Sequence, residues 1–569
     1  MSAATAIAKP RELTVRAVVV AVLVAALIGS SYPYVVLKIG FGPNISVVSA
    51  FFGYILLTLV GLAFSTRATR QEMNLVQTAG TAAGQAGFMC VVLAAFDMLR
   101  QKPELGFNVQ LTTFQIFAWL SLAGVIGVLL AVPLRKHYID EENLPFPDGT
   151  AAGETLLVLD QGPAQAGPRV AALGLGMGAS GLLAVIRDGL HALPEALHFG
   201  ASGQALRMGT EVSLLSFGSG MLVGLRIALS MGLGMLLSWV ISPPLLVEQG
   251  IIAAPIFKDV LRWVMWPATG LLVAGGLTAL LLKWRVVART FTHFSAGDVD
   301  STDMPLSVVF AGVVVATVGL CVLQSYSLGF PVWLTLISLV VSFVLMLVGT
   351  RVLGETNWAP VSALANFTQA LFALLSPGNI AVNMIGSGMS GTIAANGEHL
   401  MQDFKAGKIV GSSNRNLTIL QLIGVPVGAL SVALVYPVLA AKYGIGENGL
   451  SSPISVKWAG FGELVSKGFD ALPAGCFAAL GVAVVLGIAL TVLEGRFAKF
   501  VPSPTGVGIG MLVPGLAVMP MLLGGIAQFI WLKTRPETEG KFNLPLASGF
   551  VAGEALVVLV LALGAMFGV

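Results

Sequence analysis

Long apolar runs separated by short polar segments dominate this chain. About 20 apolar residues are enough for a helix to cross a membrane, so each run predicts one span. The pattern therefore predicts an all-α polytopic membrane protein with about 14 to 16 transmembrane helices. The predicted spans cover residues 15–37, 46–64, 75–99, 111–134, 170–190, 211–241, 262–282, 306–323, 331–348, 360–375, 380–400, 417–440, 470–493, 504–532 and 545–567.

The two halves of the chain resemble each other. The segment Gly218–Gly234 (GSGMLVGLRIALSMGLG) overlays without gaps on Gly508–Gly524 (GIGMLVPGLAVMPMLLG). Four shorter matches keep the same order along the chain: residues 29–33 with 354–360, 80–81 with 391–392, 153–154 with 462–463, and 273–275 with 551–553. We therefore predict a tandem duplication, with a first repeat at 13–285, a connecting segment with an additional helix at 286–327, and a second repeat at 328–569.

The repeat spacing also predicts an orientation. Seven helices plus one make an even number of crossings, so both copies would have the same orientation, related by an axis along the membrane normal. The loop charges disagree with this count of crossings. Lys283, Arg285 and Arg289 form a basic loop of the kind found on the cytoplasmic side, yet seven crossings from a cytoplasmic N-terminus would place that loop outside. We therefore expect a re-entrant or split segment, with Leu144–Leu156 and Ser451–Leu464 as the best candidates.

Composition narrows the class of protein. Of 569 residues, 56% are hydrophobic and 10% are charged, which leaves no room for a sizeable soluble domain, so any site must lie between helices. The net charge of +3 comes from scattered basic residues and excludes a nucleic-acid-binding footprint. Lys9, Arg11 and Arg16 precede the first apolar run and predict a cytoplasmic N-terminus. No ATP-binding signature is present, so we expect no cofactor and an ion gradient as the energy source.

A polar, glycine-rich stretch from Ser387 to Gly424 lies among these spans. Such a backbone is tolerated at membrane depth only where it is buried in protein or lines a watery cavity. On a helix, Glu398 pairs with Gln402 and His399 with Asp403 at i, i+4 spacing, giving two polar stripes. The stretch lacks a zinc-type ligand spacing, so we expect no metal held by the protein. We predict instead that Asn396, Glu398, His399 and Asp403 bind a zwitterionic substrate.

Two further ionisable residues fall inside predicted spans, where charges are costly and are candidates for function. Glu554 is either a proton carrier or one half of a fixed ion pair. Arg226 is expected to be a structural partner of an acidic group, and both should face the protein interior. The remaining histidines, His137, His191, His198 and His293, lie in or near loops and are expected to be solvated.

Several motifs together resemble the oligopeptide transporter family, including its yellow stripe-like branch. They are KIGFGPN (38–44), NLVQTAGTAAGQAG (74–87), LPFPDGTAAGE (144–154), GETNWAP (354–360), the stretch from Asn396 to Ala429, and VPSPTGVGIGM (501–511). The resemblance implies a secondary transporter that moves peptides or metal chelates with protons. It adds Gln77, Thr81, Gln85 and Asn357 as substrate-binding candidates, and Glu154, Glu398 and Glu554 as proton-coupling candidates.

The leading hypothesis is a proton-coupled importer of small oligopeptides or metal-chelate complexes in a bacterial-type inner membrane. Its partners would be that substrate and membrane lipids, with a homo-oligomer left open. The alternatives are a passive channel or a transporter of another small polar solute, and a membrane-embedded enzyme. A channel would favour a continuous ring of like residues, and an enzyme would need a paired nucleophile and base or a metal motif. Neither pattern is found in the sequence.

Overall fold

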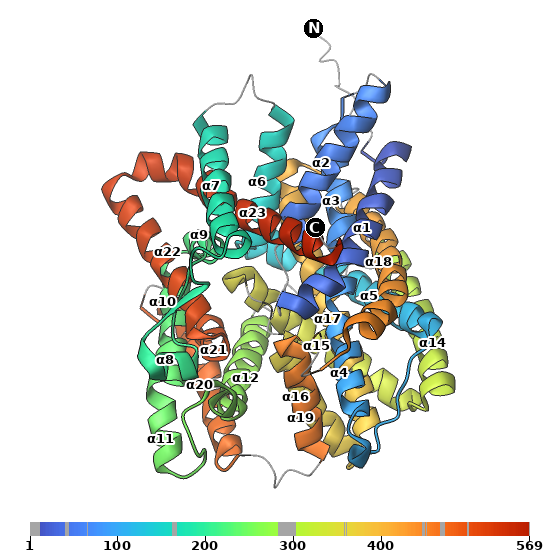
Figure 1. Cartoon of the computed structure of the whole chain (residues 1–569), viewed down its shortest axis with the longest axis vertical. Helices are drawn as coiled ribbons and strands as arrows, with labels where there is room; N and C mark the ends of the chain where they lie inside the picture. Colours follow the sequence, from blue (N-terminus) through green and yellow to red (C-terminus); the bar gives the residue numbers. More distant parts are fainter. Residues whose placement is uncertain are drawn as a thin grey trace.

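Helices make up nearly all of the described structure. The computed structural model describes residues 12–39, 45–64, 67–161, 168–282, 303–357, 359, 361–446, 450, 452–466, 473–497 and 500–567. Some residues named above lie outside this description. They are Lys283, Arg285 and Arg289, residues 40–44 of the KIGFGPN motif, and Trp358 and Pro360 of the GETNWAP motif. Figure 1 shows a helical body with a pair of helices, α6 and α7, projecting at one end.

The first half of the chain contains twelve of the described α-helices. They are α1 (Val15–Ile39), α2 (Ile45–Phe64), α3 (Arg70–Phe88), α4 (Cys90–Arg100), α5 (Thr113–Ala131), α6 (Pro147–Gln161), α7 (Pro168–Ala184), α8 (Gly200–Leu206), α9 (Leu214–Val223), α10 (Leu225–Leu236), α11 (Ser242–Glu248) and α12 (Phe257–Leu282). Short 3₁₀ or π segments join them: η1 (Pro103–Leu105), η2 (Val132–Leu134), η3 (Lys136–Glu141), η5 (Val185–Gly189) and η6 (Leu237–Ile241). A two-stranded antiparallel sheet, β1 (Ala196–His198) with β2 (Gly209–Glu211), lies in a region predicted as loop.

The second half contains ten described helices. They are α14 (Leu306–Leu328), α15 (Val332–Thr356), α16 (Val361–Leu375), α17 (Ile380–Val410), α18 (Asn414–Tyr443), α19 (Pro453–Ser466), α20 (Cys476–Phe497), α21 (Pro504–Leu512), α22 (Gly515–Thr534) and α23 (Pro536–Phe567).

The polytopic all-α prediction is confirmed. Among the described residues, 11 helices are long and apolar enough to cross a membrane, and every predicted span coincides with a helix or a broken pair of helices. Two spans break at residues with non-helical backbone angles: 211–241 divides into α9 and α10 at Gly224, and 504–532 divides into α21 and α22 at Val513 and Pro514. Span 75–99 is interrupted only at Met89, between α3 and α4, where the backbone stays in the helical region. Gly224 has a φ of +82°, a conformation that favours glycine.

The segments predicted to be re-entrant or split form short helices. Both α6, with 15 residues, and α19, with 14, begin at a proline. At 1.5 Å per residue these helices are roughly 21 to 23 Å long, shorter than the ~30 Å of a bilayer's hydrocarbon core. Neither helix spans a bilayer by itself when it stands along the membrane normal.

The two broken helix pairs cross each other with reciprocal contacts. A Cβ added to Gly220 of α9 would lie 2.0 Å from the Met521 carbonyl oxygen of α22. A Cβ added to Gly510 of α21 would lie 2.1 Å from the Met231 carbonyl oxygen of α10. Gly220 and Gly510 are equivalent in the sequence overlay, and so are Met231 and Met521. The contact is therefore repeated with the halves exchanged, as a two-fold relation requires. The repeat boundaries and the direction of the axis stay predictions.

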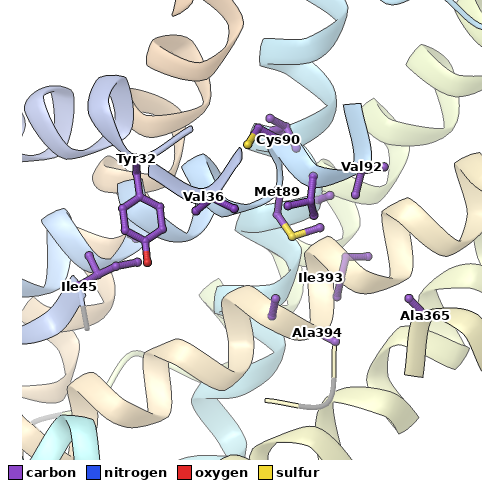
Figure 2. Close-up of a cluster of buried hydrophobic side chains, with 14 of the residues drawn as sticks. Tyr32, Val36, Ile45, Met89, Cys90, Val92, Ala365, Ile393 and Ala394 are labelled. Atoms are coloured by element: carbon purple, nitrogen blue, oxygen red, sulfur yellow. The ribbon is translucent and has the colours of Figure 1, made fainter. Parts of the chain in front are cut away.

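Helix α17 passes through the centre of the bundle. It packs against α3, α5, α6, α15 and α16, and 26 of its 31 residues are buried. The Asn379 side chain caps its start by accepting a hydrogen bond from the Val382 amide at 3.0 Å, and Gly411, with a φ of +82°, ends it. Figure 2 shows apolar side chains of α17, Ile393 and Ala394, beside Met89 at the junction of α3 and α4.

The helix ends define two faces of the molecule. At one face, called here the N-terminal face, Arg16 of α1 pairs with Glu72 at the start of α3, and Glu72 completes a capping box with Thr69. The ends of α4 and α18 and the start of α17 lie at the opposite face, called here the far face. In Figure 1 α2 lies in the upper part of the molecule and α4 in the lower part.

Candidate functional site

Asp403 is the centre of a buried polar cluster between α3, α17 and α18. Gln77 Nε2 donates to Asp403 Oδ1 at 2.5 Å, Thr78 Oγ1 donates to Oδ2 at 2.8 Å, and the Gln421 amide also donates to Oδ2. Thr81 Oγ1 accepts a hydrogen bond from Gln77 Nε2 at 2.9 Å. All five side chains are almost fully buried. Neutral donors thus satisfy both carboxylate oxygens, and no ion pair to Asp403 is found among the described residues.

Two acceptor atoms of α3 have no hydrogen-bond partner among the described residues. They are Gln77 Oε1 and, one helical turn before it, Asn74 Oδ1. The Asn74 amide donates to Ser412 Oγ at 2.9 Å, next to the end of α17. The cluster therefore keeps unused acceptors beside the Asp403 carboxylate. Such acceptors suit the ammonium or amide groups of a ligand.

Glu398 is a buried carboxylic acid with no partner. Its exposed fraction is 0%, and neither Oε1 nor Oε2 makes a hydrogen bond within the described part of the chain. It faces Gly349 of α15 so closely that a Cβ there would lie 1.8 Å from Oε1. An unpaired buried charge costs several kcal/mol, and an ionised Glu398 would be such a charge in these surroundings.

Asn396 and His399 bond to their own helix. Asn396 Nδ2 donates to the Thr392 carbonyl at 2.8 Å, and His399 Nδ1 lies 3.0 Å from the Ala395 carbonyl. Asn396 Oδ1 has no partner among the described residues. The match of Gly80-Thr81 with Gly391-Thr392 makes Gln85 the counterpart of Asn396. Gln85 Nε2 likewise has no hydrogen-bond partner among the described residues. The two copies thus each place one unsatisfied amide in the interior.

Asn357 joins three helices. It ends α15 with a φ of +63°, and its Nδ2 donates to Asp148 Oδ1 of α6 at 2.7 Å. Gln402 of α17 accepts a hydrogen bond from the Gly149 amide at 2.7 Å. The structure therefore places Asn357 at the start of α6, among helix-terminal contacts, and not in the Asp403 cluster. Glu154 lies half-buried further along α6.

Glu554 has the geometry of a fixed ion pair. Arg187 Nη1 lies 2.8 Å from Glu554 Oε1, and the Leu215 amide at the start of α9 donates to Oε2 at 2.9 Å. A carboxylate at a helix N-terminus is favoured by the exposed amides there. Burial and the Glu554 charge raise the pKa of Glu211, which lies on β2 before the start of α9. The proton-carrier role of Glu554 stays a prediction, although the observed contacts match the ion-pair alternative.

Arg226 pairs with Glu494 of α20, with Nη2 2.6 Å from Oε1. Its side chain is 37% exposed, so the expectation that Arg226 faces the interior is only partly met. The pair links α10 of the first half of the chain to α20 of the second half.

Sequence reasoning missed a second buried polar network. Arg351 of α15 pairs with Glu142 at 2.5 Å and with Glu355 at 2.9 Å, and Ser503 at the start of α21 donates to Glu355 at 3.1 Å. Arg351 follows the predicted span 331–348, and extending that span by one turn would have identified an intramembrane charge. Thr78 and Gln421 were also missed, because their role depends on which helices pack together.

The expectation that His137 is solvated is wrong. Its side chain is 2% exposed, with Nε2 3.3 Å from Glu142 and Nδ1 3.5 Å from Glu141. It is buried because η3 packs against α17 and is tied to α15, where the neighbouring Tyr138 hydroxyl donates to the Leu347 carbonyl at 2.8 Å. Within the described residues, no group of three or more His, Cys, Asp or Glu side chains could hold a metal ion.

The chain is similar to known membrane transporters over nearly its whole length. Residues 12–565 match the family described as "OPT oligopeptide transporter protein". A "Probable metal-nicotianamine transporter" of Oryza sativa subsp. japonica is 23% identical, covering 96% of this chain and 84% of that protein. A "Putative oligopeptide transporter" of Haemophilus influenzae is 24% identical over 93% of this chain and 92% of its own length. One of Saccharomyces cerevisiae is 22% identical over 96% and 95%.

Proposed function

The chain belongs to the OPT oligopeptide transporter family, and from this premise we propose that it accumulates small oligopeptides or metal-chelate complexes by coupling their movement to protons. Relatives named as oligopeptide transporters and as metal-nicotianamine transporters support both kinds of substrate. Both kinds carry carboxylate and amine groups, for which the amide and carboxylate side chains around Asp403 supply donors and acceptors.

The observation that carries the proton coupling is the isolation of Glu398. Glu398 is fully buried and makes no hydrogen bond among the described residues. It lies on the same helix as Asp403, five positions before it. When protonated, Glu398 is a neutral group in a neutral environment. When it loses the proton it becomes an unpaired buried charge, which is stable only if the surroundings open to water or supply a cation. Loss of the proton therefore favours a different conformation, which is the requirement for symport.

The distribution of basic residues supports one orientation in the membrane. Arg16, Arg67, Arg135, Lys405 and Lys408 lie at the N-terminal face, whereas Arg100, Lys102 and Lys442 lie at the far face. Positive residues are enriched on the cytoplasmic side of membrane proteins. We propose that the N-terminal face is cytoplasmic, in a bacterial-type inner membrane, and that uptake proceeds from the far face.

Uptake into proteoliposomes with and without an imposed proton gradient tests the proposal. We expect the wild-type protein to accumulate labelled trialanine or a metal–nicotianamine complex above equilibrium only with inward proton flow. If the substrate only equilibrates across the membrane, at a rate that does not depend on the proton gradient, the protein is a channel. The Glu398→Gln variant should lose gradient-driven accumulation at least tenfold and keep exchange of labelled for unlabelled substrate, because its site no longer releases a proton.

Glu104→Gln is the matched control, since Glu104 is an exposed carboxylate at the far face, and it should behave as wild type. If Glu398→Gln also retains full gradient-driven accumulation, Glu398 is not the carrier. The same substitution at Glu154 and Glu554 then tests the two other candidates.

A further inference from the structure

An open cavity of about 750 Å³ lies at the far face. It is bounded by the end of α4, the connection from α4 to α5, and the end of α18. Its polar lining consists of Asp97, Arg100, Gln101, Asn108 and Gln110, and its apolar lining is limited to Ala440 and Ile445, beside Gly444. Its volume is in the range that holds a small ligand, about 300–1,000 Å³.

Arg100 and Asp97 hold opposite charges in this cavity with bonding capacity to spare. Arg100 Nη2 donates to Asp97 Oδ1 at 2.8 Å, and the Tyr436 hydroxyl of α18 donates to Asp97 Oδ2 at 2.7 Å. The Arg100 side chain lines the cavity and is 32% exposed. A guanidinium has five N–H donors in a fork that matches a carboxylate, so Arg100 remains able to bind an acid group while it keeps its contact with Asp97.

The lining selects a ligand of a definite chemical class. One guanidinium, one carboxylate and three side-chain amides match a molecule that carries a carboxylate, an ammonium group and amide bonds within a short distance. A polyanion is disfavoured because Arg100 is the one cation among the lining residues, and neighbouring Lys102 pairs with Glu463 at 2.6 Å. An apolar ligand would find little apolar surface.

The cavity lies on the same helices as the buried cluster around Asp403. α3 and α4 follow each other with only Met89 between them, and they carry Gln77 at one end and Asp97 at the other. Twenty residues of helix separate these two positions by about 30 Å, close to the thickness of the hydrocarbon core. α18 likewise carries Gln421 in the cluster and Tyr436 beside the cavity.

We propose that this cavity is a first recognition site for zwitterionic substrates, in which Arg100 binds the ligand's carboxylate and Asp97 its ammonium group. The proposal rests on the proposed transport function, because it assigns the substrate's outer binding site. The alternative is that Asp97, Arg100 and Tyr436 only tie α4 to α18, and the two differ in how they respond to changes in the ligand.

A cycle of protein and ligand changes distinguishes these alternatives. Binding of trialanine and of trialanine amide is measured by calorimetry on the purified protein without a gradient, and KM and Vmax are measured in proteoliposomes. For the wild type we expect the amide to bind about tenfold more weakly, since a hydrogen bond between charged groups is lost. The Arg100→Gln variant should bind trialanine about tenfold more weakly, raise KM with little change in Vmax, and no longer distinguish trialanine from its amide.

Two further variants complete the test. Arg100→Lys keeps the charge and should retain the preference for the free carboxylate, and Lys102→Gln, outside the cavity, should match the wild type. The proposal is overturned if trialanine does not bind, or if Arg100→Gln weakens trialanine and its amide equally. Binding that depends on Arg100 without gradient-driven accumulation would instead overturn the proposed proton coupling and leave the recognition site intact.

Discussion

At the scale of single residues, the candidate site separates two carboxyl groups by their surroundings. Asp403 receives three hydrogen bonds from Gln77, Thr78 and Gln421, whereas Glu398 receives none within the described residues. Hydrogen bonds from neutral donors offset part of the cost of burying a carboxylate, and Glu398 lacks such donors among the described residues. The two acids therefore differ in their surroundings on one helix, and the proposed function assigns ligand binding to Asp403 and proton exchange to Glu398.

Gly349 provides the test of how tightly Glu398 is enclosed. A methyl group there would lie 1.8 Å from Glu398 Oε1, so Gly349→Ala should lower the melting temperature of the purified protein, at a cost of about 1–3 kcal/mol. In the double variant Gly349→Ala/Glu398→Ala the Glu398 side chain is shortened, so adding the methyl group at Gly349 should cost much less than it does when Glu398 is intact. Gly178→Ala is the control, because nothing lies near its Cβ position. Additive effects of the two substitutions would mean that the cost of Gly349→Ala does not come from contact with Glu398.

At the scale of helices, the sequence predicted where apolar segments lie but not how they break or which of them meet. Periodicity and length identified the spans, because both depend on local composition. The break at Gly224 was inside a run that remains apolar on both sides, so hydropathy carried no sign of it. The bond from Gln77 to Asp403 joins positions 326 residues apart, and only the packing of α3 against α17 brings them together. The candidates Gln77, Thr81 and Asp403 do meet, whereas Asn357 lies elsewhere.

The broken helix α21–α22 yields a prediction at this scale. At the break, the Val513 carbonyl accepts a hydrogen bond from Trp239 Nε1 at 3.0 Å, and the Trp239 ring stacks on Phe257. Trp239→Phe keeps an aromatic ring but leaves a buried carbonyl unpaired, which should destabilise the protein by about 1–3 kcal/mol.

Thermal unfolding in detergent measures the change. Trp263→Phe is the matched control, since Trp263 makes the same kind of bond, to the Ala474 carbonyl at 3.0 Å, at an exposed position where water replaces it. Equal effects of the two substitutions would show that the hydrogen bond from Trp239 to Val513 stabilises the protein no more than the exposed bond from Trp263 to Ala474 does.

At the scale of the whole molecule, the reciprocal contacts relate the two halves. α7 packs along α23 and α20 along α12, so each half is completed by helices of the other. This arrangement explains why no division into separately folding domains is visible in the sequence, although the repeat itself is. The charged residues Glu398 and Asp403 of α17 have no charged counterparts near Gln85 on α3, so the chemistry is unequal between similar halves.

If the halves are related as the contacts indicate, equivalent substitutions should have equal effects. Gly220→Ala and Gly510→Ala each place a methyl group against a carbonyl oxygen of the opposite half, at 2.0 and 2.1 Å. Each should lower the melting temperature by a similar amount, with a cost of about 1–3 kcal/mol, while Gly174→Ala, with open space around it, should not. A strong effect at one position and none at the other would contradict the equivalence.

The same crossing has a mechanical consequence. Where two helices touch through side chains, they can slide by exchanging rotamers, as in shear motions. At Gly220 and Gly510 the backbones touch directly, with no side chain between them to rearrange. Sliding would drive one backbone into the other, whereas turning about the point of contact leaves the separation unchanged. The two contacts thus favour rotation about the crossing over sliding as the relative motion of these four helices.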